Sequence, residues 1–197
     1  MDKPAFVFVG NHFTTDFVNT RKNVKGIRTE LIESWGHLMS WLEQADRRKW
    51  VISDREELTP DEQDTIIQKI LIIRSRIEQA FTQIIQEQSI PASIVTFLNQ
   101  ELARYRSYYQ IEAGDQERPF TTVRNYEITQ LPALFLEEAC LFFTTFKLAN
   151  LKKCENHACI LFFYDSSRNQ QRRWCSMDKC GNRVKVNQHY HRKKNQE

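Results

Sequence analysis

Residues 154–180 read CENHACILFFYDSSRNQQRRWCSMDKC and hold four of the five cysteines of the chain. The four, in the pattern C-x4-C-x15-C-x4-C, are Cys154, Cys159, Cys175 and Cys180. Two pairs of thiolates on tight turns can converge on a tetrahedral Zn²⁺ ion. The apolar run over residues 160–164, between the pairs, has the β-rich character of a ribbon joining two knuckles. The spacing therefore predicts one structural zinc ion bound by four cysteines.

The segment around these cysteines is basic, whereas the rest of the chain is mildly acidic. The 197 residues carry a net charge of only +3. Residues 151–197, however, contain eleven Lys or Arg against four acids, a net charge of +7. The other 150 residues contain 17 basic and 21 acidic residues, a net charge of −4. This division predicts two modules with different partners, over residues 1–150 and 151–197.

The basic segment needs a source of stability besides its hydrophobic core. Forty-seven residues with eleven cations cannot easily bury enough apolar surface to fold alone. A structural zinc ion contributes roughly 10–16 kcal/mol of binding free energy, coupled to folding. A shell of four thiolates leaves no position for water, so the site should be structural rather than catalytic. The alternatives are buried or redox-paired thiols, and a site in which His157 replaces one cysteine.

The composition narrows the class of protein. Hydrophobic residues make up 41% and charged residues 27%, which excludes a disordered chain and a collagen-like fibre. The most apolar region, residues 131–149, is interrupted by Glu137 and Glu138 and does not suit a membrane span. The first residues lack the basic segment that begins a signal peptide. We therefore expect a cytoplasmic protein without a membrane partner.

The predicted fold of the body is α+β and mainly α, with small antiparallel β-hairpins. The clearest helix begins at Thr59-Pro60-Asp61-Glu62. The threonine hydroxyl can cap the helix, and the glutamate side chain can accept the threonine backbone N–H. Apolar residues at helical spacing extend this helix to about residue 88. Further helices are predicted over residues 34–45, 94–105 and 131–150. Hairpins are predicted over residues 6–18, around Gly10-Asn11, and over residues 108–127, around Gly114-Asp115.

The residues around the cysteines carry a resemblance to a known family. Residues 172–177 (RRWCSM) and 180–183 (CGNR), with the loop at 165–169, resemble the CGNR-type zinc finger. Residues 6–10 and 16–20 resemble the start of the ABATE domain, which is commonly fused ahead of this finger. The two resemblances together cover essentially the whole chain. They imply that the four cysteines bind zinc, that the finger contacts DNA in a stress-induced transcription regulator, and that the body senses a small ligand.

A basic helix is predicted to follow Gly181, with one stripe formed by residues 183, 187, 190 and 194. Arg and Asn can read base edges there, while Lys and Tyr can reach phosphates. Basic residues before Cys175 form a second candidate set. The predicted nucleic-acid contacts are Arg168, Arg172, Arg173, Arg183, Lys185, Asn187, Tyr190 and Lys194. The alternatives are a solvated surface helix and, for the second set, packing of one guanidinium on Trp174.

Polar residues near the N-terminus form a candidate site for a small effector. They are Asn11, His12, Asp16 and Asn19. In the alternative interpretation, Asp16 and Asn19 cap a following turn and His12 is an exposed strand residue.

Three classes of function follow from these features. We expect a ligand-responsive regulator that binds DNA through its finger. The second class is an RNA-binding or protein-docking zinc module, and the third is an enzyme that the finger stabilises. We do not expect an enzyme, because the chain lacks a Gly-rich phosphate loop, a nucleophile elbow and His/Glu pairs at catalytic metal spacing. The sequence indicates neither the effector nor the operator, and it shows no heptad or clear dimer face.

Overall fold

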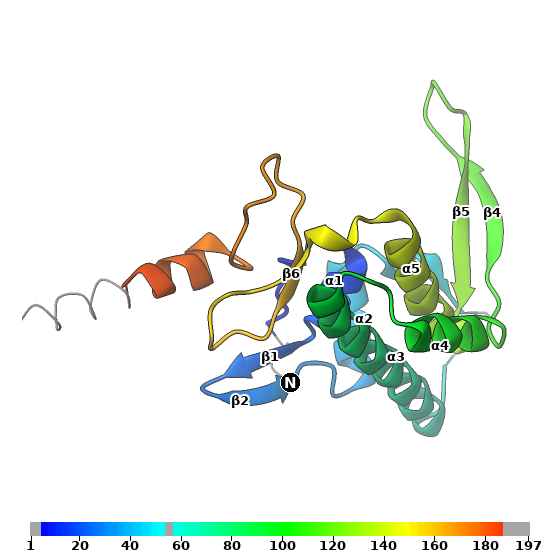
Figure 1. Ribbon diagram of the computed structural model, residues 1–197. Coiled ribbons are helices and arrows are strands. Elements are labelled where there is room, and N and C mark those ends of the chain that lie inside the picture. The colour runs from blue at the N-terminus through cyan, green and yellow to red at the C-terminus, as the bar shows by residue number, and fades with distance from the viewer. Residues whose placement is uncertain (1–4, 54–56, 187–197) are drawn as a thin grey trace, which may run out of the picture.

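The longest helix of the computed structural model, which describes residues 5–53 and 57–186, is α3 (Pro60–Glu87; Figure 1). It begins at the predicted capping box. The Thr59 hydroxyl accepts the Glu62 N–H at 3.3 Å, and the Glu62 carboxylate accepts the Thr59 N–H at 2.9 Å. The helix ends at Gln88, which adopts the left-handed conformation with φ 54°. Its isoleucine-rich face is buried, and Ile70, Ile77 and Ile84 are fully inaccessible.

The other helices pack around α3, and the predicted mainly helical fold is confirmed. They are α1 (Phe13–Val18), α2 (Trp35–Gln44), α4 (Ala92–Leu102) and α5 (Pro132–Thr145). Short 3-10 turns are η1 (Arg48–Trp50), η2 (Ile128–Gln130) and η3 (Leu148–Asn150). Helix α5 is buried nearly all round, as predicted, and it packs against α3 and α4. It stops before the predicted end because Phe146 is extended, with ψ 144°.

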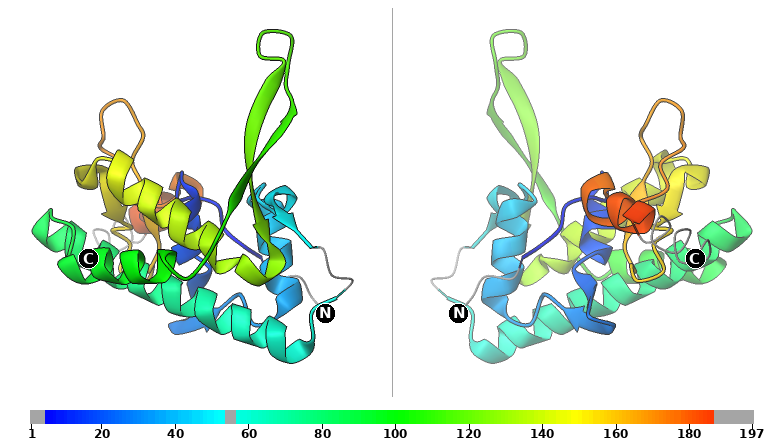
Figure 2. Two further views of the ribbon diagram at one scale, coloured as in Figure 1. Left: turned by 90° about the vertical axis from the view of Figure 1, so that its right-hand side faces the viewer. Right: turned by 90° about the vertical axis from the view of Figure 1, so that its left-hand side faces the viewer.

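The strands form three small sheets. Their bounds are β1 (Arg21–Val24), β2 (Ile27–Glu30), β3 (Val51–Ile52), β4 (Tyr108–Ala113), β5 (Phe120–Glu127), β6 (Leu151–Lys153) and β7 (Phe162–Tyr164). Strands β4 and β5 form the predicted hairpin, which projects from the helical body in Figure 2. Strand β3 pairs in parallel with β5. In the basic segment β6 pairs with β7, and the turn η4 (Met177–Gly181) continues as α-helix over residues 182–186.

The hairpin predicted over residues 6–18 is wrong. Residues 6–9 form no strand, and residues 13–18 form α1. The helical spacing brings Phe13 and Phe17 to one face, where their ring centres lie 5.0 Å from Trp41 and 4.4 Å from Phe135 respectively. Burial of these rings outweighs the strand preference of the β-branched residues between them. Asn11 adopts the left-handed conformation, with φ 61°, that asparagine tolerates.

Hairpin β1–β2, which the sequence did not reveal, is tied to α3 by charged side chains. The completely buried Arg74 donates to the Thr20 hydroxyl at 2.6 Å and to the Glu30 carboxylate at 2.7 Å. Arg21 and Arg28 of the hairpin both pair with Glu78 of α3. Burial raises the pKa of Glu30, but the hydrogen bonds and charge of Arg74 outweigh it and hold that pKa below its usual range.

We expect Glu30→Gln to lower the free energy of unfolding by about 3 kcal/mol at pH 7, because it leaves the buried Arg74 charge without its counterion. The depressed pKa means that the stabilisation by Glu30 is present above the unfolded pKa of about 4.3 and is lost as the pH falls through the folded value. Urea unfolding of both proteins should therefore show a stability difference at pH 7 that shrinks in acid. Glu33→Gln, at an exposed carboxylate, is the control. Equal stability of wild type and Glu30→Gln at pH 7 would contradict this account.

Candidate zinc centre and nucleic-acid interface

The four cysteine side chains of the predicted zinc site converge from two turns. Their Sγ atoms all lie within 4.8 Å of one another, with Cys159–Cys175 at 3.8 Å and Cys175–Cys180 at 3.6 Å. A tetrahedral zinc with Zn–S bonds of about 2.3 Å requires sulfur atoms about 3.8 Å apart. None of the five cysteines forms a disulfide, and His157 is exposed and outside this group. The cluster therefore fits a single structural zinc ion with four cysteine ligands.

The chemistry of the crowded sulfur atoms also calls for a cation. The neighbouring Cys154 sulfur raises the pKa of Cys159 to about 12, and the Cys154 and Cys159 sulfurs raise the pKa of Cys175 as well. A bound Zn²⁺ supplies the positive charge that allows all four thiols to ionise. Because all four ligands are thiolates of the protein, no coordination position is left for a reacting water.

The first pair of cysteines lies on a turn that follows β6. The Cys154 N–H donates to the Leu161 carbonyl at 2.9 Å, and the Cys159 N–H donates to the Asn156 carbonyl at 2.8 Å. The Asn156 side-chain oxygen accepts the Ala158 N–H at 3.0 Å. These bonds fold the four intervening residues into a knuckle, so the wider spacing still brings both sulfurs to one side.

The second pair of cysteines is held by η4. The Ser176 hydroxyl accepts the Lys179 N–H at 3.3 Å, which caps the turn that carries Cys180. A side chain at Gly181 would place its Cβ 2.5 Å from Met177 Sδ and 3.2 Å from a ring carbon of Trp174. Glycine at this position therefore allows Trp174 and Met177 to close over the knuckle.

The polar residues predicted to bind an effector include two asparagines that attach β7 to the body. Asn19 is 2% exposed, and its side chain donates to the Phe162 carbonyl at 2.8 Å and accepts the Phe162 N–H at 2.9 Å. Asn11 donates to the Tyr164 carbonyl and to the Ser166 hydroxyl, both at 3.2 Å. The two side chains thus take the place of a neighbouring strand beside β7.

The other two predicted effector contacts also have partners within the protein. The His12 ring accepts the Thr14 N–H at 3.0 Å and so caps α1. Burial, with help from the charge of Arg47, lowers the pKa of His12 to about 4. Asp16 accepts the Gly10 N–H at 2.7 Å, and burial raises its pKa to about 6. Contact of these four residues with a ligand stays a prediction.

Two of the basic residues in the predicted nucleic-acid set have partners within the protein. The Arg172 guanidinium donates to the carbonyls of Val9, at 2.8 Å, and Trp174, at 3.0 Å. Arg173 lies 5.1 Å from the ring centre of Trp174 and pairs with Glu155 at 2.6 Å. The packing alternative is confirmed for Arg173, whereas contact of either arginine with nucleic acid stays a prediction.

A buried carboxylate shapes the loop over residues 166–171. Asp165 is fully inaccessible and accepts the Arg172 N–H at 2.8 Å, the Ser167 N–H at 3.1 Å and the Lys152 ammonium at 2.7 Å. The same ammonium donates to the Gln170 carbonyl at 2.6 Å. These bonds close the loop at its base and leave its tip in solvent.

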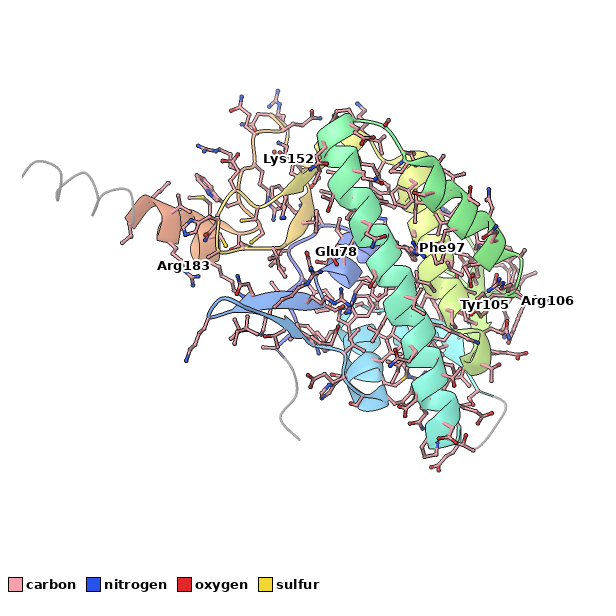
Figure 3. All side chains as sticks on the ribbon, turned by 60° about the horizontal axis from the view of Figure 1, so that its bottom comes forward. Glu78, Phe97, Tyr105, Arg106, Lys152 and Arg183 are labelled. Carbon is pink, nitrogen blue, oxygen red and sulfur yellow. The ribbon has the colours of Figure 1, made fainter. Side chains whose placement is uncertain are left out.

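The remaining described members of the predicted set are exposed. Arg168 lies on the loop over residues 166–171, and Arg183 and Lys185 lie on the helical residues 182–186 (Arg183 is labelled in Figure 3). Within the described part of the chain, none of the three forms an ion pair. The other predicted contacts, Asn187, Tyr190 and Lys194, lie outside the described residues.

We expect one zinc ion per chain in the purified protein and its loss in Cys175→Ser, because three thiolates cannot complete the tetrahedral shell. Metal analysis and thermal unfolding of both proteins provide the test. The matched control is Cys140→Ser, because Cys140 lies on α5 outside the cluster and should leave the zinc content unchanged. Full zinc occupancy in Cys175→Ser, or equal loss in Cys140→Ser, would rule out the four-cysteine site.

Comparisons with known proteins agree with this geometry. Residues 150–193 match the CGNR zinc finger. Residues 11–136 match the ABATE family, described as "Putative stress-induced transcription regulator". No curated protein sequence matches the chain. Within the described ranges, no helix combines the length and apolar character needed to cross a membrane. The chain therefore belongs to the ABATE family and carries a CGNR zinc finger after its ABATE domain.

Proposed function

We propose that this protein is a transcription regulator that binds DNA through its zinc finger. The observation that carries the proposal is the exposure of Arg168 on a loop of the zinc-binding segment and of Arg183 and Lys185 on the helix that follows the last cysteine. Arginine can pair with guanine edges and lysine with phosphates, so such a group suits a duplex. The family description supports the regulatory part of the proposal.

The body and the finger act together in this proposal. We place the body at residues 1–150 and the finger at 151–197. Phe162 of the finger is buried in the hydrophobic core of the body, so the finger is presented in a defined orientation. A DNA-binding module that is docked in this way can respond to changes in the body.

We expect the full-length, zinc-loaded protein to bind duplex DNA with an affinity that falls steeply with salt, by roughly 0.9 log units per log unit of salt for each phosphate contact. Arg183→Gln should weaken binding, whereas Lys69→Gln, at an exposed lysine of α3, should not. Fluorescence anisotropy over a salt series measures both effects.

Competition with bulk tRNA distinguishes a DNA-binding protein from an RNA-binding one. A DNA regulator should keep a selected duplex when bulk tRNA is added, whereas loss of the duplex to tRNA would favour an RNA-binding module. Absence of salt-dependent binding to every DNA and RNA tested would contradict both functions.

A second function, sensing of a small ligand, is supported by a pocket of 380 Å³ between α5 and hairpin β4–β5. Its walls include Trp50, Tyr109 and Tyr126, and the Tyr126 hydroxyl donates to the Glu137 carboxylate at 2.7 Å. Aromatic walls with a few fixed polar groups are typical of small-molecule sites. We propose this pocket as an effector site.

The pocket has a physical connection to the finger. Glu138 lines the pocket, and its backbone carbonyl accepts the Thr14 hydroxyl of α1 at 3.0 Å. The residue that follows α1 is Asn19, which bonds the backbone of β7. A ligand that moves α5 would therefore act on the helix that positions the finger.

We expect a metabolite that fits this pocket to raise the melting temperature of the wild type, since a ligand at 100 times its Kd adds about 2.7 kcal/mol of stability. Trp50→Ala should lose this response, whereas Phe97→Ala, in a separate pocket on α4, should keep it. A thermal-shift panel measures the response relative to each unliganded protein.

We also propose that the protein is not an enzyme, so conversion of a binding metabolite into product would overturn this assignment.

A further inference from the structure

We propose that a groove between hairpin β1–β2 and the zinc finger binds a backbone phosphate of the nucleic acid, so that the body contributes directly to the interface. This inference rests on the proposed DNA binding. The groove has a volume of 250 Å³. Lys22 and Asn23 of β1 line it from the body, and Asn156, Lys179 and Arg183 line it from the finger.

The two elements lie side by side although they are distant in the sequence. Figures 1 and 3 both draw the helix over residues 182–186 on the same side of the body as hairpin β1–β2, and Figure 3 labels Arg183 on this helix. Arg183 therefore belongs both to the groove and to the predicted recognition stripe. In this proposal, a nucleic-acid strand that contacts the helix places one phosphate in the groove, between Lys22 and Arg183.

The positive charges of the groove lack acidic partners. Within the described ranges Lys22, Lys179 and Arg183 form no ion pair, and the Lys22 ammonium donates to the Ala5 carbonyl at 3.4 Å. The adjacent Arg21 and Arg28, in contrast, are neutralised by glutamates. The groove cations thus differ from Arg21 and Arg28 in having no acidic partner among the described residues.

The zinc centre neutralises only part of this charge. Three of its cysteines line the groove, and a zinc ion with four thiolates carries a formal charge of about −2. The three cations exceed that charge by one. A phosphodiester carries one negative charge, so it would complete the balance.

A buried donor in the groove also lacks a partner. Asn156 is 3% exposed, and its side-chain oxygen is used by the Ala158 N–H. Its amide nitrogen is buried and has no hydrogen-bond partner among the described residues. Such a donor costs about 1–3 kcal/mol when left unpaired. Asn156 lines the groove and phosphate oxygens are acceptors, so we expect a bound phosphate to offer this amide a partner.

The test uses full-length, zinc-loaded protein and a duplex over a salt series. Lys22→Gln should reduce the slope of log affinity against log salt by roughly 0.9, which makes the affinity gained between 200 and 50 mM salt about threefold smaller than in the wild type. Lys69→Gln should match the wild type in slope. The Asn156 side-chain amide should shift in NMR spectra when the duplex is added. Zinc content verifies that each variant is folded.

The outcomes separate this inference from the proposed function. If the wild type binds duplex and Lys22→Gln has the same affinity and slope, the groove is not part of the interface, although DNA binding stands. If the wild type binds no nucleic acid, the proposed function fails. Titration with inorganic phosphate then tests whether the groove binds a phosphate group. A phosphate-induced shift of the Asn156 amide that is lost in Lys22→Gln would identify a site for a free phosphate group, and no shift would overturn the groove.

Discussion

The position of the zinc finger on the body depends on the three-residue strand β7. Successive side chains of a strand point to opposite faces, and here each face belongs to a different core. Phe162 is 2% exposed and packs in the core of the body, whereas Phe163 is fully buried in the cluster that contains the zinc-binding cysteines. The Asn19 side chain satisfies both backbone groups of Phe162. Strand β7 therefore contributes to both cores, and neither core can move relative to the other without exposing Phe162 or Phe163.

This docking determines which charges of the basic segment reach solvent. Lys152 forms an ion pair with the buried Asp165 at the base of a loop. Arg172 donates to backbone carbonyls and lies over the ring of Phe163. Both cations therefore stabilise the finger itself. Among the described residues, Arg168 on the loop and Arg183 on the helix after the last zinc ligand are exposed and form no ion pair. These cations are therefore available to a partner, whereas Lys152 and Arg172 already have partners within the protein.

Features with a local cause could be predicted from the sequence, and features that depend on distant partners could not. The capping box at Thr59 and the cysteine spacing both act within a few residues, and both predictions are confirmed. Helix α1 was missed because its helical state depends on rings of Trp41 and Phe135, which lie far along the chain. Hairpin β1–β2 was missed for a similar reason, since its anchor is the buried Arg74 on α3. For the finger-docking role of Asn19, the available signal was a polar residue directly after an apolar run, which also fits a simple cap.

In the proposed function, control of the finger by the body would use these same contacts. A ligand can shift a conformational equilibrium only by its difference in affinity between the two states. A ligand at α5 gains such a difference if the position of α5 depends on the position of α1, and the bond from Thr14 to the Glu138 carbonyl couples them. Helix α1 in turn cannot move without breaking the bonds of Asn19 to β7, which would leave buried backbone groups unpaired. Since these bonds resist partial displacement, the finger should exchange between docked and undocked arrangements rather than shift by small degrees.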